Sequence, residues 1–403
     1  MSQEPGHRPL EGLRVLDLTR LLPGGFCTLL LADLGADVLK VEDTSGGDYI
    51  RWMPPYYGGK EQREDGTASA YFLALNRNKR SLKIDLKHPE GRDVLLRLAE
   101  DHDVLVESFR PGVMERLGLG YDALEKRNPR LVYCAISGYG QNSPLRERSG
   151  HDINYLALAG LLGLTGKRGG PPIQSAGQIA DLGGGGLMAA VGILAALRER
   201  ERSGAGQVVD ISMFDGALSW LSMVIARFFC EKQVPERGEL ELAGGILCYF
   251  PYKTKGGDWV SLGALEPKFW QNWCDGVGRP ELKEKQFEHP SSEAGKKVAA
   301  IFRRRTREEW TAFAAEHDCC LEPVLDLEEA LAHEQTIARH MVLELDQPGM
   351  GPVRQAGFPI RLSRTPARIE SPAPALGEQT DEVLKAIGYD EARIERLRGE
   401  GVV

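Results

Sequence analysis

The sequence predicts an α/β protein in which a large domain with a doubly wound parallel sheet is joined to a smaller α+β domain. Two observations support this prediction. Short apolar strands alternate with helices in the first third of the chain, which is the pattern of βαβ units. Near residue 235 the composition changes and a hairpin pattern begins. The chain has 403 residues, enough to form two separate cores.

The first βαβ unit contains a strand, a glycine-containing loop, a helix and a second strand, at 14–18, 23–25, 26–34 and 36–41. A crossover through one helix makes the two strands parallel. No GxGxxG run follows the first strand, so the sequence does not predict a nicotinamide dinucleotide site.

The same alternation continues to residue 232 and defines the predicted large domain, residues 1–232. We expect its further strands at 81–86, 104–107, 131–136 and 207–212. We expect its further helices at 89–100, 112–127, 152–164, 182–202 and 214–232.

The predicted small domain, residues 233–340, begins with a hairpin of strands at 248–253 and 259–263. Helices at 267–276, 292–304 and 307–316 and a short strand at 321–325 follow. Residues 341–403 contain a proline-rich stretch and a final helix at 379–388. We expect them to return along the large domain as a strap.

Composition excludes several classes of partner. The formal net charge of −8 argues against a general nucleic-acid or anionic-membrane binder. The start of the chain lacks a secretory pattern, and no apolar stretch reaches the ~20 residues that span a bilayer. The seven cysteines show no metal-ligand spacing. We therefore expect a cytoplasmic protein with reduced thiols and no metal.

His151 and Asp181 are the strongest candidates for catalysis. Each stands at the predicted start of a helix, and 30 residues separate them. An imidazole and a carboxylate on opposite sides of a substrate carbon could remove a proton from one face and return it to the other. The alternative is structural, because aspartate often caps a helix and a lone histidine is often a surface residue.

Neighbouring residues extend this candidate site. Asp152, with other polar side chains, crowds the entry to the apolar helix after His151, which suggests a lined cavity. Gly183 and Gly184 belong to a run of four glycines whose backbone N–H groups could hold an enolate oxygen. Glu266, before Pro267 in the small domain, either orients His151 or simply favours a helix N-terminus.

Three basic clusters could meet the phosphates of a ligand. Arg51 follows Gly46–Asp48, Lys79 and Arg80 precede a strand, and Arg110 and Arg116 follow one. The carboxyl ends of strands are where doubly wound sheets bind ligands. The alternative for each cluster is a solvated cationic loop.

The chain resembles the class III CoA-transferase (CaiB/BaiF) superfamily. The resemblance rests on segments spread over nearly the whole chain, among them Leu31–Glu42, Asn78–Ser81, Phe109–Gly112, Ser203–Gln207 and Leu376–Glu378. It implies an interlocked homodimer, with each site formed by one chain's large domain and the partner's small domain. It also implies an acyl-CoA substrate and no cofactor beyond the CoA moiety. Ser108, Arg110 and Arg116 would then lie near CoA.

Within this superfamily the chain is most similar to the α-methylacyl-CoA racemase branch, at Gly150–Tyr155, at the step to Asp181 and at Gly263–Pro267. The transferases usually carry tyrosine where this chain has His151. Racemases tend to have a basic residue after the second strand, whereas this chain has Glu42 and Asp43. That departure moves the expected nucleotide contacts to Arg51, Lys79 and Arg80.

The prediction is thus a racemase or epimerase of 2-methylacyl-CoA thioesters. In it His151 and Asp181 exchange the α-proton through an enolate, and Glu266 is a partner of His151. The alternative is a CoA-transferase that moves CoA between carboxylic acids with Asp181 as nucleophile. A third possibility is a CoA-ester-binding homologue without activity. The racemase depends on one geometric condition, namely that residues 151 and 181 lie together.

Overall fold

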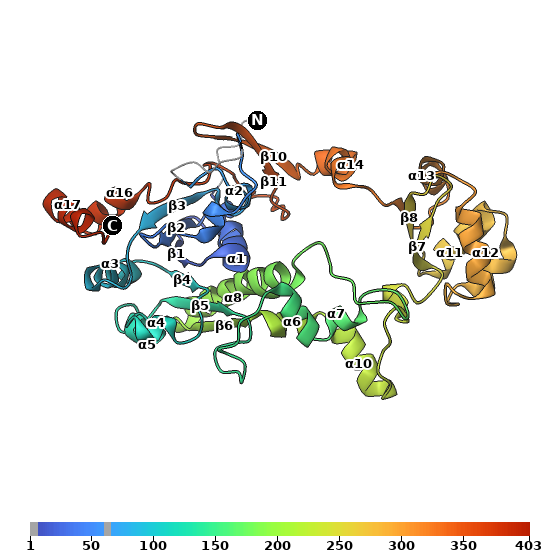
Figure 1. Cartoon of the computed structure of the whole chain (residues 1–403), viewed down its shortest axis with the longest axis horizontal. Helices are drawn as coiled ribbons and strands as arrows, with labels where there is room; N and C mark the ends of the chain where they lie inside the picture. Colours follow the sequence, from blue (N-terminus) through green and yellow to red (C-terminus); the bar gives the residue numbers. More distant parts are fainter. Residues whose placement is uncertain (1–6, 60–65) are drawn as a thin grey trace. The chain divides into compact units, whose positions relative to one another are not determined.

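The computed structural model describes residues 7–59 and 66–403. The chain divides into two compact units (Figure 1). The large unit comprises Met1–Ala159, Gly177–Ser219 and Gln335–Val403, and the small unit comprises Gly160–Ala176 and Trp220–Glu334. The predicted boundary at residue 232 therefore differs from the observed division. Residues 160–176 and the helix at Ser222–Glu231 (α10) group with the small unit.

Six parallel strands form the sheet of the large unit, in the order β3-β2-β1-β4-β5-β6. They are β1 (Arg14–Leu18), β2 (Asp37–Glu42), β3 (Lys79–Lys83), β4 (Val104–Glu107), β5 (Val132–Ser137) and β6 (Val208–Ser212). This confirms the predicted doubly wound sheet. The chain direction across the sheet reverses between β1 and β4, so the carboxyl ends of these two strands flank the crevice where such folds bind ligands.

Helices cover both faces of this sheet. They are α1 (Leu21–Asp33), α2 (Ala70–Asn76), α3 (Pro89–Glu100), α4 (Val113–Arg116), α5 (Tyr121–Glu125), α6 (Asp152–Leu158), η2 (Ile179–Leu187), α8 (Met188–Ser203) and α9 (Met213–Ser219), with the short 3-10 turn η1 (Tyr49–Trp52). The predicted loop at 23–25 is wrong, because α1 already begins at Leu21. Proline is tolerated in the first helical turn, where its missing N–H is not needed.

The strap of the large unit contains a hairpin, β10 (Val342–Gln347) with β11 (Gly351–Ala356), and two helices, α16 (Thr380–Ala386) and α17 (Glu391–Gly399). Residues of both helices join the apolar core on the α3 side of the sheet. The Arg77 guanidinium donates to the backbone oxygen of Ala356 at 2.8 Å. The strap thus packs on the large unit, as predicted.

The small unit has an antiparallel sheet in the order β7-β8-β9: Tyr249–Lys253, Trp259–Gly263 and Leu321–Pro323. The predicted hairpin and helices are present. The helices of this unit are α7 (Leu161–Leu164), α10, η3 (Glu241–Ala243), α11 (Pro267–Gly276), η4 (Pro280–Lys285), α12 (Glu293–Phe302), α13 (Arg307–Glu316) and α14 (Leu327–Ala332), and α15 (Glu334–Ala338) spans the boundary. Its core is aromatic, with the Trp273 ring stacked 5.3 Å from Phe302.

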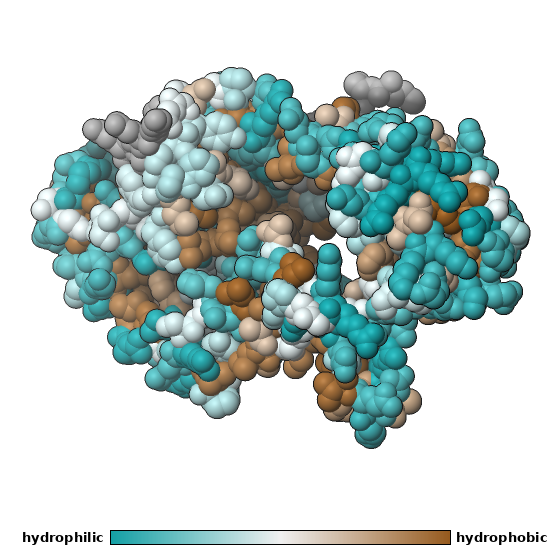
Figure 2. All heavy atoms as spheres, turned by 45° about the vertical axis from the view of Figure 1, so that its right-hand side comes forward, coloured by the Kyte–Doolittle hydropathy of each residue, from teal (hydrophilic) through white to brown (hydrophobic). Residues whose placement is uncertain are grey.

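One unbroken helix among the described residues, Ile179–Ser203, is long and apolar enough to cross a membrane by length and composition. It packs against α1, β5 and β6, which is the position of a covering helix in a doubly wound domain. Apolar side chains remain exposed on α8 and α10, including Val191, Leu194, Met223 and Phe229. Apolar areas on the surface are visible in brown in Figure 2.

Three of the four consecutive glycines in the Ile179–Ser203 helix, Gly184–Gly186, are explained by packing. Gly184, Gly185 and Gly186 are buried. A Cβ on Gly184 would lie 3.0 Å from the carbonyl oxygen of Met213 in α9, and a Cβ on Gly186 would lie 2.6 Å from that of Pro23 in α1. Glycine lets three helices approach each other at distances that a side chain would prevent.

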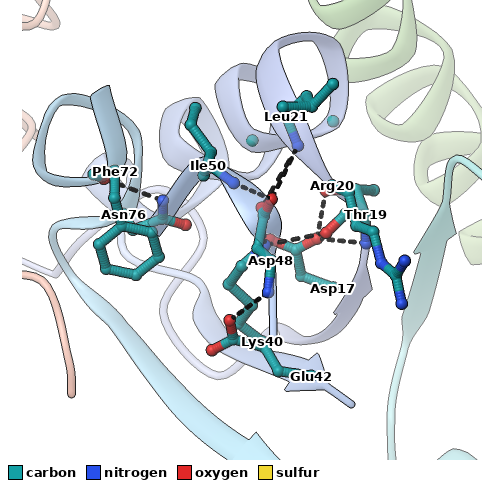
Figure 3. A network of polar contacts seen from close by, with 12 residues as sticks. Asp17, Thr19, Arg20, Leu21, Lys40, Glu42, Asp48, Ile50, Phe72 and Asn76 are labelled. Carbon is teal, nitrogen blue, oxygen red and sulfur yellow. Dashed lines mark hydrogen bonds and ion pairs between the residues drawn. The ribbon is translucent and has the colours of Figure 1, made fainter. Parts of the chain in front are cut away.

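A buried network of charges holds the loops at the carboxyl ends of β1 and β2 (Figure 3). Lys40 pairs with Asp48 at 3.0 Å, and Asp48 accepts the N–H groups of Leu21 and Ile50. Burial acts to raise the pKa of the nearby Asp17, but the charge of Lys40 and of a second buried lysine lowers it below its usual value. The network therefore contains ionised groups that fix the start of α1.

Arg51 extends this network. Its guanidinium makes two hydrogen bonds to the Glu42 carboxylate, at 2.8 and 2.7 Å, and a third at 3.1 Å to the backbone oxygen of Pro374 in the strap. Both charged side chains are almost fully buried. Arg51 thus joins β2 to the strap across more than 300 residues of sequence.

We expect Arg51→Ala to destabilise the large unit by about 3–5 kcal/mol, because it leaves the Glu42 carboxylate buried and unpaired. Urea denaturation followed by circular dichroism measures the change. Arg80→Ala is the control, because Arg80 pairs with Asp37 at the surface, where a pair contributes about 0–1 kcal/mol. Equal losses for the two variants would contradict a stabilising role for the buried pair.

We expect Gly184→Ala to lower the free energy of unfolding by about 1–3 kcal/mol, because the new Cβ forces η2 away from α9. Gly399→Ala in α17 is the matched control, since nothing lies within 4 Å of a Cβ there. That substitution should be neutral or stabilise by up to ~1 kcal/mol through helix propensity. If Gly184→Ala were as stable as the control, close packing would not be the reason for the glycine.

Candidate functional site

The candidate site lies at the carboxyl edge of the sheet of the large unit, where the loops after β1, β4 and β5 meet. The backbone N–H of Arg20, after β1, donates to the Oγ of Ser108, after β4, at 3.1 Å. The Arg110 guanidinium donates to the Oγ of Ser149 at 2.7 Å, in the loop that follows β5. Two side-chain hydrogen bonds therefore connect three loops that are distant in sequence.

His151 is the N-cap residue of α6, and its side chain is exposed. Its backbone N–H donates to the Asn154 Oδ1 at 3.1 Å. The preceding residue is fixed by Tyr155, whose hydroxyl donates to the backbone oxygen of Gly150 at 2.6 Å. A Cβ on Gly150 would lie 2.7 Å from the Tyr155 ring, so glycine is needed there. These contacts hold the imidazole at the end of α6.

Asp152 joins the two segments that the sequence singles out. Its buried Oδ1 accepts the backbone N–H of Ala180 at 2.7 Å and that of Asp181 at 3.1 Å. The first N–H groups of a helix have no partner within it, and a carboxylate is a preferred acceptor for them. The Asp152 carboxylate thus holds the start of η2 next to the start of α6. We assign Asp152 to positioning rather than to proton transfer.

Asp181 is half-buried in the first turn of η2. Burial, followed by the negative charge of Asp152, raises its pKa to about 6, and His151 acts in the opposite direction. Burial is the largest of these effects. A pKa near 6 suits a group that both accepts and donates a proton.

Gly183 and Gly184 lie inside the helical segment η2, which has π-helical geometry. The earlier N–H groups of Ala180 and Asp181 already donate to Asp152, and that of Leu182 donates to the Gln178 oxygen at 2.9 Å. The glycine run serves helix packing, and we do not assign it to an oxyanion site. A π-helical turn is nevertheless frequent at functional sites.

Three of the predicted phosphate contacts are engaged elsewhere. Arg51 and Lys79 are buried in the charge network, where Lys79 donates to Asp17 at 3.1 Å. Burial lowers the pKa of Lys79 to about 8. Arg80 is at the surface and pairs with Asp37 at 2.7 Å. The sequence did not reveal these partners, because they come from other strands and loops.

The other predicted cations stand at the site's edge. Arg110 and Arg116 are exposed, and no ion pair holds either of them within the described residues. Arg116 folds back toward Gly112, where a Cβ would lie 3.2 Å from its Nη1. Ser108 and Arg110 make the loop contacts given above. These three residues share the crevice edge that the sheet order defines.

Sequence reasoning missed Arg20 and Glu107, which both lie at this edge. The Arg20 guanidinium pairs with Asp43 and lies 5.7 Å from the centre of the Phe109 ring. Glu107 is the last residue of β4 and is buried. Both could have been found from the sequence by their position, because each stands at or just after the end of a strand. These two strands flank the point where the strand order of the sheet reverses.

Glu266 belongs to the small unit, where it is exposed at the N-cap of α11. Burial, followed by the charge of Glu266, raises the pKa of Cys320. A cavity of about 870 Å³ in this unit includes Gly263 and Cys320 in its wall. Its lining contains four cations and no carboxylate: Lys167, Arg168, Lys253 and Arg303.

Comparison with known proteins agrees with the resemblance seen in the sequence. Residues 10–380 match the model of CoA-transferase family III. An alpha-methylacyl-CoA racemase of Mus musculus is 38% identical over 98% of this chain and 97% of that protein. A succinyl-CoA:glutarate CoA-transferase of Mus musculus is 34% identical over 98% of this chain and 90% of that protein.

A solved structure of a CaiB/BaiF family protein from Brucella suis is 30% identical and superposes with a TM-score of 0.80, covering 94% of this chain and 99% of that chain. Its similarity extends over both units described above. Since the family model and the curated relatives each cover most of the chain, the protein belongs to CoA-transferase family III.

Proposed function

We propose that this member of CoA-transferase family III is a racemase or epimerase of 2-methylacyl-CoA-type thioesters. The observation that carries the proposal is the contact of Asp152 with the backbone of Asp181, which brings the His151 and Asp181 segments together. An imidazole and a carboxyl group of raised pKa then share one end of the sheet. This pairing of two different bases suits proton transfer at one carbon.

In the proposed reaction the thioester carbonyl acidifies the α-hydrogen. The carboxylate of Asp181 accepts the α-proton of one enantiomer, and the electron pair of the C–H bond moves into the enolate. The imidazolium of His151 returns a proton to the opposite face, and the roles reverse for the other enantiomer. Each step transfers one proton between the substrate and a side chain, and nothing is oxidised or reduced. No cofactor beyond the CoA moiety is needed for it.

The pKa of about 6 at Asp181 supports this role. At neutral pH most molecules carry the carboxylate needed as base, and the conjugate acid is still strong enough to return the proton. General acid–base catalysis contributes typically ~10²–10⁴-fold. Positioning of the thioester by the loops at the sheet edge must supply much of the remaining acceleration.

For the CoA moiety we propose contacts with Ser108, Arg110 and Arg116. Exposed guanidinium groups suit phosphate oxygens through paired hydrogen bonds. We leave out Arg51 and Lys79, because both are buried with anionic partners. Arg80 is left out because it pairs with Asp37.

The alternative is a CoA-transferase with Asp181 as nucleophile, and the transferase relative at 34% identity favours it. A half-buried carboxylate could attack the thioester carbonyl, form an acyl-enzyme anhydride and release CoA as the thiolate. His151 argues for the racemase, because transferases of this family usually have tyrosine at that position.

We also propose that the protein works as the homodimer implied by its family, with Glu266 supplied to each His151 by the partner subunit. The exposed apolar side chains of α8 and α10 support an additional interface. Its substrate would be an acyl-CoA, and we propose a cytoplasmic location.

To test the two-base mechanism, both enantiomers of a 2-methylacyl-CoA are incubated in D₂O without an acceptor acid. Inversion is followed by chiral chromatography and α-deuterium by mass spectrometry. Asp181→Asn and His151→Ala should each lose inversion by about 10²-fold or more, since either base alone cannot serve both faces. Each variant should retain exchange on one enantiomer only, and the two should retain opposite ones.

His7→Ala, at an exposed site, is the control and should keep wild-type rates. Inversion at wild-type rates in either catalytic variant would exclude the two-base reaction. Absence of exchange in the wild type, with an acyl-enzyme that hydroxylamine traps and CoA transfer to an added carboxylate, would establish the transferase instead.

The pH dependence tests the role of Asp152. The rate of inversion should fall on the acidic side as Asp181 becomes protonated near pH 6. Asp152→Asn keeps an oxygen acceptor for the η2 N–H groups but removes a negative charge that raises the Asp181 pKa. The acidic limb should therefore move to lower pH, by up to about one unit. Asp122→Asn, at an exposed position of α5, is the control and should leave the acidic side of the pH–rate profile unchanged. If Asp152→Asn also left the profile unchanged, the electrostatic coupling of Asp152 to Asp181 would be contradicted.

A further inference from the structure

Glu107 has an unusual environment for a carboxylic acid. It is the last residue of β4, and its side chain is buried at the carboxyl edge of the sheet. The backbone N–H of Phe109 donates to its Oε2 at 2.6 Å, and the Tyr133 hydroxyl lies 3.4 Å from its Oε1. No ion pair of Glu107 occurs in the described part of the chain. A buried carboxylate without a cation is costly, so the neutral acid is favoured.

Three titratable groups act on Glu107: Tyr133 on β5, Glu115 on α4 and Asp210 on β6. The charges of Glu115 and Asp210 disfavour its ionised form, whereas the hydrogen bond from the Tyr133 hydroxyl favours it. Burial, supported by the charges of Glu115 and Asp210, raises the pKa of Glu107 to about 8, and the Phe109 N–H acts in the opposite direction. At neutral pH the side chain is therefore an uncharged acid that accepts one hydrogen bond and can donate another.

The turn that Glu107 holds is the centre of the proposed site. Ser108 contacts the loop after β1 through Arg20, and Arg110 contacts Ser149, two residues before His151. Glu107 fixes the backbone between these two contacts through Phe109. Displacement of this turn would alter both the proposed CoA contacts and the segment that carries His151.

We propose that Glu107 is a positioning residue whose neutral carboxyl group fixes the Ser108–Gly112 turn for binding of the CoA ester. This inference rests on the proposed CoA site but not on the choice between racemase and transferase. Ionisation at alkaline pH adds a third negative charge to those of Glu115 and Asp210. The turn then opens to hydrate that charge, and affinity for the CoA ester falls.

The test compares Glu107→Gln with Glu107→Ala over pH 6.5–9.5. Glutamine is the uncharged isostere of the neutral acid, and its amide oxygen can accept from the Phe109 N–H as the carboxyl oxygen does. The dissociation constant of free CoA, measured by calorimetry, should rise several-fold above pH 8 in the wild type and stay flat in Glu107→Gln. In Glu107→Ala it should already be about tenfold weaker at pH 7, the loss expected for a buried donor left unpaired.

Two further measurements separate this inference from the proposed function. Amide hydrogen exchange of residues 108–112 needs no ligand, and it should be faster in Glu107→Ala and unchanged in Glu107→Gln at pH 7. In steady-state assays Glu107→Ala should raise KM far more than it lowers kcat. Glu115→Gln, which alters a neighbouring exposed charge but not the turn, is the matched control and should keep the wild-type dissociation constant at pH 7.

A glutamine variant that binds and exchanges like the alanine variant would overturn the role of the neutral acid. Equal exchange of residues 108–112 in wild type and Glu107→Ala would overturn the positioning role altogether. Loss of α-proton exchange in the wild type, with the affinity order of the variants retained, would refute the racemase and leave the Glu107 inference standing.

Discussion

One carboxylate oxygen connects the two halves of the candidate site. The Oδ1 of Asp152 accepts two backbone N–H groups at the start of η2, and one of them belongs to Asp181. Because Asp152 directly follows His151, completing the helix start also brings the imidazole segment to the carboxyl segment. The first N–H groups of a helix need acceptors, so the site is built from a contact that the fold requires in any case.

The contact of Asp152 with the start of η2 also affects the pKa of Asp181. A helix N-terminus stabilises anions, yet the pKa of Asp181 is raised to about 6. Burial removes water from the carboxylate, and the charge of Asp152 repels it. The helix's own N–H groups are meanwhile occupied by Asp152, so they do not solvate Asp181. Asp152 thus both fixes the position of Asp181 and helps to raise its pKa toward neutrality.

The cations at this edge of the sheet fall into two groups, those buried in ion pairs and those exposed and able to contact a ligand. The charged ends of Arg51 and Lys79 lie under the loops after β1 and β2, where they meet Glu42 and Asp17. The cations after β4 remain exposed at the edge where strand order reverses. Glu107, buried below that edge without a cation, belongs to neither group. Its neutral form allows it to order a turn without adding charge beside an anionic ligand.

Periodicity and local motifs were enough to predict the doubly wound large domain, the hairpin of the small one and the family. They also indicated the candidates His151, Asp181, Ser108, Arg110 and Arg116. They could not assign the partners of Arg51, the packing role of Gly184 or the contact of Asp152 with η2. Each depends on atoms brought together from distant segments: Pro374 for Arg51, α9 for Gly184, Ala180 for Asp152. These contacts became visible in the folded chain, because burial and hydrogen-bond partners are properties of the packed structure and not of the local order of residues.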